Sequence, residues 1–147
     1  MDDWLVLGLA AALAYGLSAF FSKLAMSTDH LGVSPHIGGL FTGLGVASVF
    51  IIYYLFIAGF KVPTTTLGGA LAAYLVGFLW ALGLVFVYFA LLKNADISKM
   101  APIYNMNTLL VVLLGIVVLR ELPNPSNAVK VFLGALLIIL GGILVSG

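Results

Sequence analysis

The stretch from residue 67 to residue 92 reads LGGALAAYLVGFLWALGLVFVYFALL and contains no charged side chain. A helix that crosses a lipid bilayer needs about 20 consecutive apolar residues, and this stretch exceeds that length. It is unbroken, whereas a strand of a membrane β-barrel alternates apolar and polar residues. The stretch therefore predicts a transmembrane helix, and it sets the fold class for the rest of the chain.

Four further stretches have the same character. The five expected spans cover residues 4–26, 37–60, 67–92, 99–119 and 127–145. Of the 147 residues, 63% are hydrophobic and only 7% are charged, so a soluble domain could not hide the apolar surface. We expect one all-α transmembrane domain over residues 1–147, with Thr66 and Ser98 capping its third and fourth helices.

The six Lys and Arg residues are divided evenly between the two faces of the membrane. An odd number of spans places the two termini on opposite sides, so the loops alternate. One face holds Lys61, Arg120 and Lys130, and the other holds Lys23, Lys93 and Lys99. An excess of basic residues on one face normally fixes the orientation of a membrane protein. The balance predicts insertion in both orientations and pairing with an inverted copy of the same chain.

Composition disfavours several functions. The chain has no cysteine and a net charge of +1, and His30 and His36 stand without other metal ligands nearby. We expect no enzyme, no metal site, no cofactor and no nucleic-acid partner. The carboxylates all fall in loops or at the ends of the apolar runs, and Asp96 is expected to form a solvated pair with Lys93 or Lys99. Proton-coupled carriers usually keep a carboxylate at membrane depth, so that mechanism is disfavoured.

Polar and aromatic side chains inside the apolar runs are the candidates for a substrate site. The candidate residues are Tyr15, Ser18 and Ser22 in the first run, Trp80 and Tyr88 in the third, and Tyr104, Asn105, Asn107 and Thr108 in the fourth. Amides in lipid are costly without partners, so they should face protein or a wet cavity. The alternative is that these groups only form hydrogen bonds between helices. Gly39 and Gly43, four residues apart, predict close packing of the second helix.

Several segments resemble one transporter family. They are Ala101-Pro102-Ile103-Tyr104-Asn105, Arg120-Glu121-Leu122, the glycine-rich run ending at Gly141-Gly142, and Trp4, Gly8, Tyr15-Gly16-Leu17-Ser18 and Lys23 at the start. Together they resemble the EamA domain of the drug/metabolite transporter superfamily. Most members of that family hold two five-helix repeats in inverted orientation. The resemblance therefore implies half of a ten-helix fold, with a substrate cavity near the midplane and alternating access.

The chain departs from the family pattern at two places. Asn107-Thr108 stands where a Glu-Pro pair is typical of the fourth helix, and an Arg often found in the second helix is missing. Our leading hypothesis is an antiparallel homodimer in the plasma membrane that moves a small neutral, zwitterionic or cationic metabolite. The alternatives are a non-transporting membrane subunit, a lipid-carrier flippase and an exporter like the small multidrug resistance proteins. The essential membrane Glu of that last family would fall near Ala14 or Tyr15.

Overall fold

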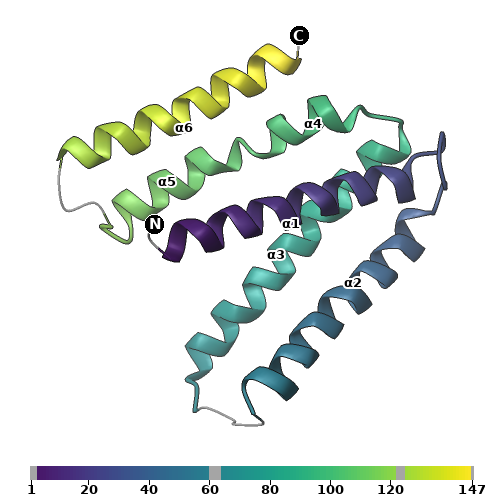
Figure 1. Ribbon diagram of the computed structural model, residues 1–147, viewed down its shortest axis with the longest axis horizontal. Coiled ribbons are helices and arrows are strands. Elements are labelled where there is room, and N and C mark those ends of the chain that lie inside the picture. Colours follow the sequence, from purple (N-terminus) through teal and green to yellow (C-terminus); the bar gives the residue numbers. More distant parts are fainter. Residues whose placement is uncertain (1–2, 60–63, 122–124, 147) are drawn as a thin grey trace. The chain divides into compact units, whose positions relative to one another are not determined.

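The computed structural model describes residues 3–59, 64–121 and 125–146, and within these ranges every regular element is helical (Figure 1). Five stretches of the described chain are long and apolar enough to cross a membrane. They are Asp3–Met26, Pro35–Ile57, Leu67–Leu92, Ile97–Val117 and Ala128–Val145. The all-α fold with five transmembrane helices is thereby confirmed.

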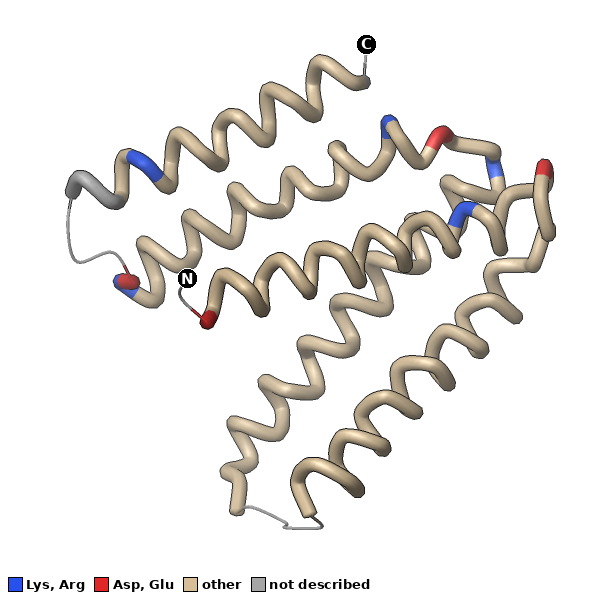
Figure 2. Tube along the Cα trace, in the orientation of Figure 1, with Lys and Arg blue, Asp and Glu red and all other residues tan. Residues whose placement is uncertain are grey.

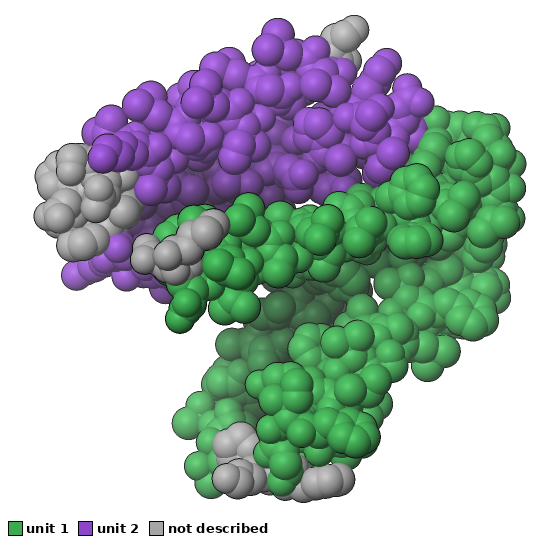
Figure 3. Space-filling model, viewed as in Figure 1, with its two compact units in different colours: residues 1–94 green, residues 95–147 purple. Residues whose placement is uncertain are grey.

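The chain forms two compact units, which Figure 3 colours separately. Unit one, Met1–Asn94, contains α1 (Asp3–Met26), α2 (Pro35–Ile52) with its extension η1 (Tyr53–Ile57), and α3 (Leu67–Leu92). Unit two, Ala95–Gly147, contains α4 (Ile97–Tyr104), α5 (Asn107–Val117) and α6 (Pro125–Ser146). Each unit is described by itself below.

The helix ends of unit one follow local chemistry. The Gly69 N–H donates to the Thr66 hydroxyl at 3.1 Å, which confirms Thr66 as the N-cap of α3. At the end of the second span, η1 winds as a π-helix, with the Ala58 N–H donating to the Tyr53 carbonyl at 3.1 Å. Gly59 follows with φ +62°, a conformation that suits glycine after a helix. The expected last residue of this span, Phe60, lies outside the described residues.

A cluster of polar side chains ties the loop after α1 to the end of α3. The Asn94 side-chain oxygen accepts from the Ser27 hydroxyl at 2.9 Å and from the Thr28 hydroxyl at 3.0 Å. The Asn94 amide nitrogen donates to the Asp29 carboxylate at 3.3 Å. Ser27 is fully buried, so its hydroxyl needs this partner. We call these four residues the loop clasp; they fix the connection between the first two helices against the third.

Unit two differs from the sequence prediction in its first span. The expected continuous helix over 99–119 is two helices, α4 and α5, interrupted at Asn105 and Met106. Pro102 inside α4 lacks the N–H that would bond to the Ser98 carbonyl four residues back, so one bond is missing within α4 before the break. The Met106 N–H donates to the Ile103 carbonyl at 3.1 Å, three residues back, which is the tighter 3₁₀ pattern. The polar residues that marked this run as unusual therefore mark a break in the helix.

The start of α4 also corrects a prediction. Asp96, not Ser98, occupies the N-cap position, and Ser98 lies inside the helix. The prediction was wrong because the helix begins two residues earlier than the apolar run. Asp96 pairs with Lys99 at 3.8 Å with both side chains exposed, which confirms the expected solvated pair. Figure 2 shows the charged residues of the described chain near helix ends and in connections.

Helix α6 packs along both α4 and α5. A Cβ placed on Gly142 would lie 3.2 Å from the Pro102 carbonyl oxygen and 3.3 Å from Met106. The absence of a side chain at Gly142 therefore lets α6 approach the interrupted part of the neighbouring span. Close approach at small residues is the usual basis of helix packing in membranes.

Candidate functional site

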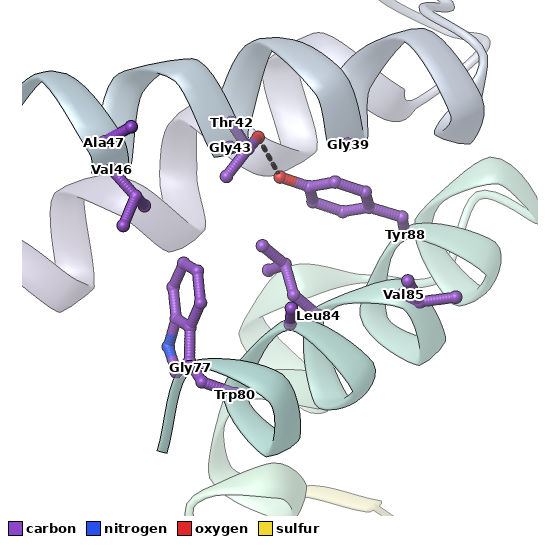
Figure 4. Close-up of a pocket in the computed structure, with 11 residues that line it drawn as sticks. Gly39, Thr42, Gly43, Val46, Ala47, Gly77, Trp80, Leu84, Val85 and Tyr88 are labelled. Atoms are coloured by element: carbon purple, nitrogen blue, oxygen red, sulfur yellow. Dashed lines mark hydrogen bonds between the residues drawn. The ribbon is translucent and has the colours of Figure 1, made fainter. Parts of the chain in front are cut away.

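A hollow of about 450 Å³ lies between α2 and α3 in unit one (Figure 4). We call it the α2–α3 groove. Its lining residues are Gly39, Thr42, Gly43, Val46 and Ala47 from α2, and Gly77, Trp80, Ala81, Leu84, Val85 and Tyr88 from α3. Ligand sites for small molecules usually measure about 300–1,000 Å³ and are lined mainly by apolar side chains with a few polar groups. The groove meets both criteria.

Small residues open the groove. Gly39, Gly43 and Ala47 follow one another at intervals of four on one face of α2. Gly77 and Ala81 do the same on the facing part of α3. A Cβ placed on Gly39, Gly43 or Gly77 would meet no atom within 4 Å. The space in front of these glycines is therefore empty, and the groove exists because side chains are missing there.

One hydrogen bond crosses the groove. The Thr42 hydroxyl on α2 and the Tyr88 hydroxyl on α3 lie 2.5 Å apart, and either can be the donor. Figure 4 shows the Tyr88 side chain extending from α3 to reach Thr42. Tyr88 is only 3% exposed, so its hydroxyl requires a partner. Whichever hydroxyl donates, the other keeps a proton of its own, and both keep lone pairs for a ligand.

The groove carries no charge. Its lining side chains are aliphatic, aromatic or hydroxyl-bearing, and the Trp80 indole, 44% exposed, is the largest of them. Figure 4 shows this indole rising from α3 towards the α2 side. In the described ranges, no group of three or more His, Cys, Asp or Glu side chains could hold a metal ion. The chemistry available in the groove is apolar contact, aromatic contact and hydrogen bonding.

Of the nine candidates chosen from the sequence, the structure brings Trp80 and Tyr88 together in the groove. The three candidates on α1 are not among the lining residues. Tyr15 is 68% exposed, and the Ser22 hydroxyl donates to the Ser18 carbonyl at 2.8 Å within the same helix. A serine hydroxyl bonded in this way is already satisfied by its own backbone.

The remaining four candidates lie at the interruption in unit two. Tyr104 ends α4, Asn105 follows it, and Asn107 and Thr108 begin α5. The Thr108 hydroxyl donates to the Asn105 carbonyl at 2.8 Å. The side chains of Asn105 and Asn107 are exposed. These four residues therefore form a second polar cluster, inside the Ile97–Val117 span.

Thr42 is the hydroxyl-bearing groove residue that the sequence analysis missed. It is one of two small hydroxyl-bearing residues in α2, the other being Ser48, and nothing in its own helix marks it. The available signal was its place between Gly39 and Gly43, which were read as packing residues. Its partner is 46 positions away in the chain, so only the pairing of α2 with α3 reveals the bond.

These features place the chain in the class of all-helical, multi-pass integral membrane proteins, and one of its two units contains an uncharged groove. A family model described as the EamA-like transporter family matches residues 3–147. The chain belongs to that transporter family, in the drug/metabolite transporter superfamily. No curated protein and no solved structure matches the chain.

Proposed function

We propose that the chain moves a small neutral, zwitterionic or cationic metabolite across the plasma membrane by alternating access. The observation that carries the proposal is an open, uncharged groove between two membrane-spanning helices of a chain from a transporter family.

The lining of the groove supports the choice of substrate. A phosphorylated or otherwise anionic metabolite needs Lys or Arg to offset its charge, and none lines the groove. Trp80 and Tyr88 offer aromatic faces on which an apolar or ring-shaped part of the substrate can lie. Hydroxyls at Thr42 and Tyr88 can orient a polar group of the substrate.

We further propose that two copies in opposite orientation form the carrier. Five spans in one chain are half of the ten helices that the family resemblance implies, and the basic residues divide three to three between the faces. The exposed amides of Asn105 and Asn107 lie in a span where lipid gives them no hydrogen bonds. A partner chain, or a wet cavity shared with one, would supply the missing bonds.

A non-transporting membrane subunit is the second candidate, and one observation favours it. Several hydroxyls inside the spans already have partners within their own unit. These pairs are Thr42 with Tyr88, Ser22 with the Ser18 carbonyl, and Thr108 with the Asn105 carbonyl. If such groups only satisfy their own backbone or, as with Thr42 and Tyr88, join two helices, no solute needs to contact them.

Flux through proteoliposomes separates the two candidates. The solutes are labelled phenyltrimethylammonium, phenylalanine and phenyl glucoside, which represent a cation, a zwitterion and a neutral molecule, with N-acetylphenylalanine as the anion. We expect flux of at least one of the first three and none of the anion. Asn107→Leu should abolish that flux while the paired state persists by cross-linking. Gly16→Ala, in open space on α1, is the matched control. Unchanged flux in Asn107→Leu would remove Asn107 from the pathway, and no flux of any solute would favour the subunit.

A further inference from the structure

We infer that the α2–α3 groove is a subsite for an uncharged, planar ring that carries one hydrogen-bonding group. This inference rests on the proposed transport function and narrows it. The ring is the part of the substrate that lies between α2 and α3, and its polar group meets the hydroxyl pair of Thr42 and Tyr88.

The dimensions fit a ring with one substituent. Trp80 and Tyr88 are eight residues apart on α3, which corresponds to about 12 Å along a helix axis. They therefore stand at two ends of the groove, with Leu84 between them, as Figure 4 shows. The volume of about 450 Å³ is at the small end of the range for ligand sites. A monocyclic or bicyclic molecule fits these limits.

The walls favour a flat shape. Gly39 and Gly43 on α2, and Gly77 on α3, present bare backbone to the groove, with open space in front of each. Glycine within a helix costs about 0.5–1 kcal/mol relative to alanine. These glycines keep the groove open at that cost, and a ring can lie against the surfaces that they leave.

The electrostatics favour an uncharged ring. No lining side chain is ionised, so a carboxylate or phosphate in the groove would lose its hydration without a counter-charge. A cation would gain only the attraction of the aromatic faces, which is smaller than the cost of burying a charge. A neutral hydroxyl or amide on the ring can instead bond to the Thr42 hydroxyl, the half-buried member of the pair, since Tyr88 is only 3% exposed.

The two tryptophans make the inference testable in the full chain. Trp4→Phe leaves Trp80 in the groove as the only tryptophan, and Trp80→Phe leaves Trp4, which is 71% exposed on α1. A bromine atom quenches indole fluorescence on contact. The probes are 4-bromobenzyl alcohol, 4-bromobenzoate, 4-bromophenyltrimethylammonium and 6-bromohexan-1-ol, added to each chain in lipid nanodiscs. The Trp4 chain measures the quenching that comes from partition into lipid.

We expect the quenching of Trp80 fluorescence by 4-bromobenzyl alcohol to saturate as the alcohol concentration rises. The quenching of Trp4 fluorescence should increase without saturating. Its dissociation constant should be at least tenfold lower than those of the anion and the cation, and the linear alcohol should not saturate. Gly43→Ala and Gly77→Ala, placed in the Trp4→Phe chain, should weaken binding about fivefold or more, because each methyl enters the groove. Gly16→Ala should change it less than twofold. The alanine variants have open space for their methyl groups, so they should fold.

Three results would overturn the inference. Equal affinity for the anion or the cation would contradict the uncharged ring. Saturable binding of the linear alcohol with equal affinity would assign the groove to lipid chains. Equal quenching of Trp80 and Trp4, or unchanged binding in both glycine variants, would remove the subsite altogether. Flux measurements test the two proposals separately. If solute flux is present and Gly43→Ala does not alter it, the carrier proposal stands and the subsite is removed. If the ring binds but no solute is transported, the subsite stands and the carrier proposal is removed.

Discussion

The hydrogen bond between Thr42 and Tyr88 joins α2 to α3, and its removal is the perturbation with the clearest expected magnitude. Tyr88→Phe keeps the ring and removes the hydroxyl, which leaves Thr42 without its partner. Thr42→Val does the converse and leaves the hydroxyl of Tyr88, a residue only 3% exposed, unpaired. Hydrogen bonds between membrane helices contribute about 0.6 kcal/mol on average and at most about 1.7 kcal/mol. We expect each single variant to lose about 1–2 kcal/mol of unfolding free energy.

The double variant distinguishes a real bond from two independent losses. When both partners become apolar, no polar group is left unpaired, so the double variant should lose less than the sum of the two single variants. The expected coupling is about 0.6–1.7 kcal/mol. The assay is equilibrium unfolding of the full chain in mixed micelles, followed by far-ultraviolet circular dichroism.

Ser48→Ala provides the matched control, because the Ser48 hydroxyl donates to the Gly45 carbonyl of its own helix at 2.7 Å and is exposed. It should change the free energy by less than about 0.5 kcal/mol. Strict additivity of Thr42→Val and Tyr88→Phe would refute the bond, and with it the polar end of the groove.

Three further predictions concern the scaffold, each measured by the same unfolding assay. Gly38→Ala should destabilise by at most about 1 kcal/mol, because its Cβ would overlap the end of the buried Met26 side chain, which is flexible and must move aside, and Gly8→Ala, in open space, should not destabilise. Asn94→Ala should lose about 1–3 kcal/mol of unfolding free energy, since the buried Ser27 O–H of the loop clasp loses its acceptor and the hydroxyl keeps only the Asp29 N–H as a partner; an unchanged midpoint would contradict the clasp. Thr66→Ala should lose about 1 kcal/mol through the N-cap of α3, whereas Thr64→Ala should lose nothing measurable.

The membrane spans could be predicted from the sequence alone, whereas the complete site could not, and the difference has a physical cause. A run such as residues 67–92 is specified by the thickness of the bilayer, which acts on each segment separately. The cap at Thr66 is likewise local, so it too could be predicted. The groove depends on which face of α2 meets which face of α3. Trp80 and Tyr88 could be selected because they are aromatic side chains inside an apolar run, but Thr42 was not selected, because its partner lies on another helix.

The fourth span illustrates the opposite error. Its composition predicted one continuous helix, and that continuity was the error; the assignment of the polar residues in its middle to a substrate site stays a prediction. The helix is instead interrupted at Asn105 and Met106, where the Met106 N–H bonds to the Ile103 carbonyl three residues back. A proline in an apolar run is tolerated in membranes when neighbouring groups satisfy the backbone, so composition alone does not reveal whether the helix continues. The contact of Gly142 with Pro102 is the tertiary feature that accompanies the break.

The central claim is that two copies of this chain in opposite orientations form one carrier. The chain has no cysteine, so a single cysteine added after Gly147 can be labelled in intact cells with a membrane-impermeant maleimide. Both orientations in one population predict labelling of about half of the chains, rising to completion after permeabilisation. Adding two lysines to one face should move that fraction strongly towards one limit. Complete labelling, or none before permeabilisation, would show a single orientation and contradict the inverted pair.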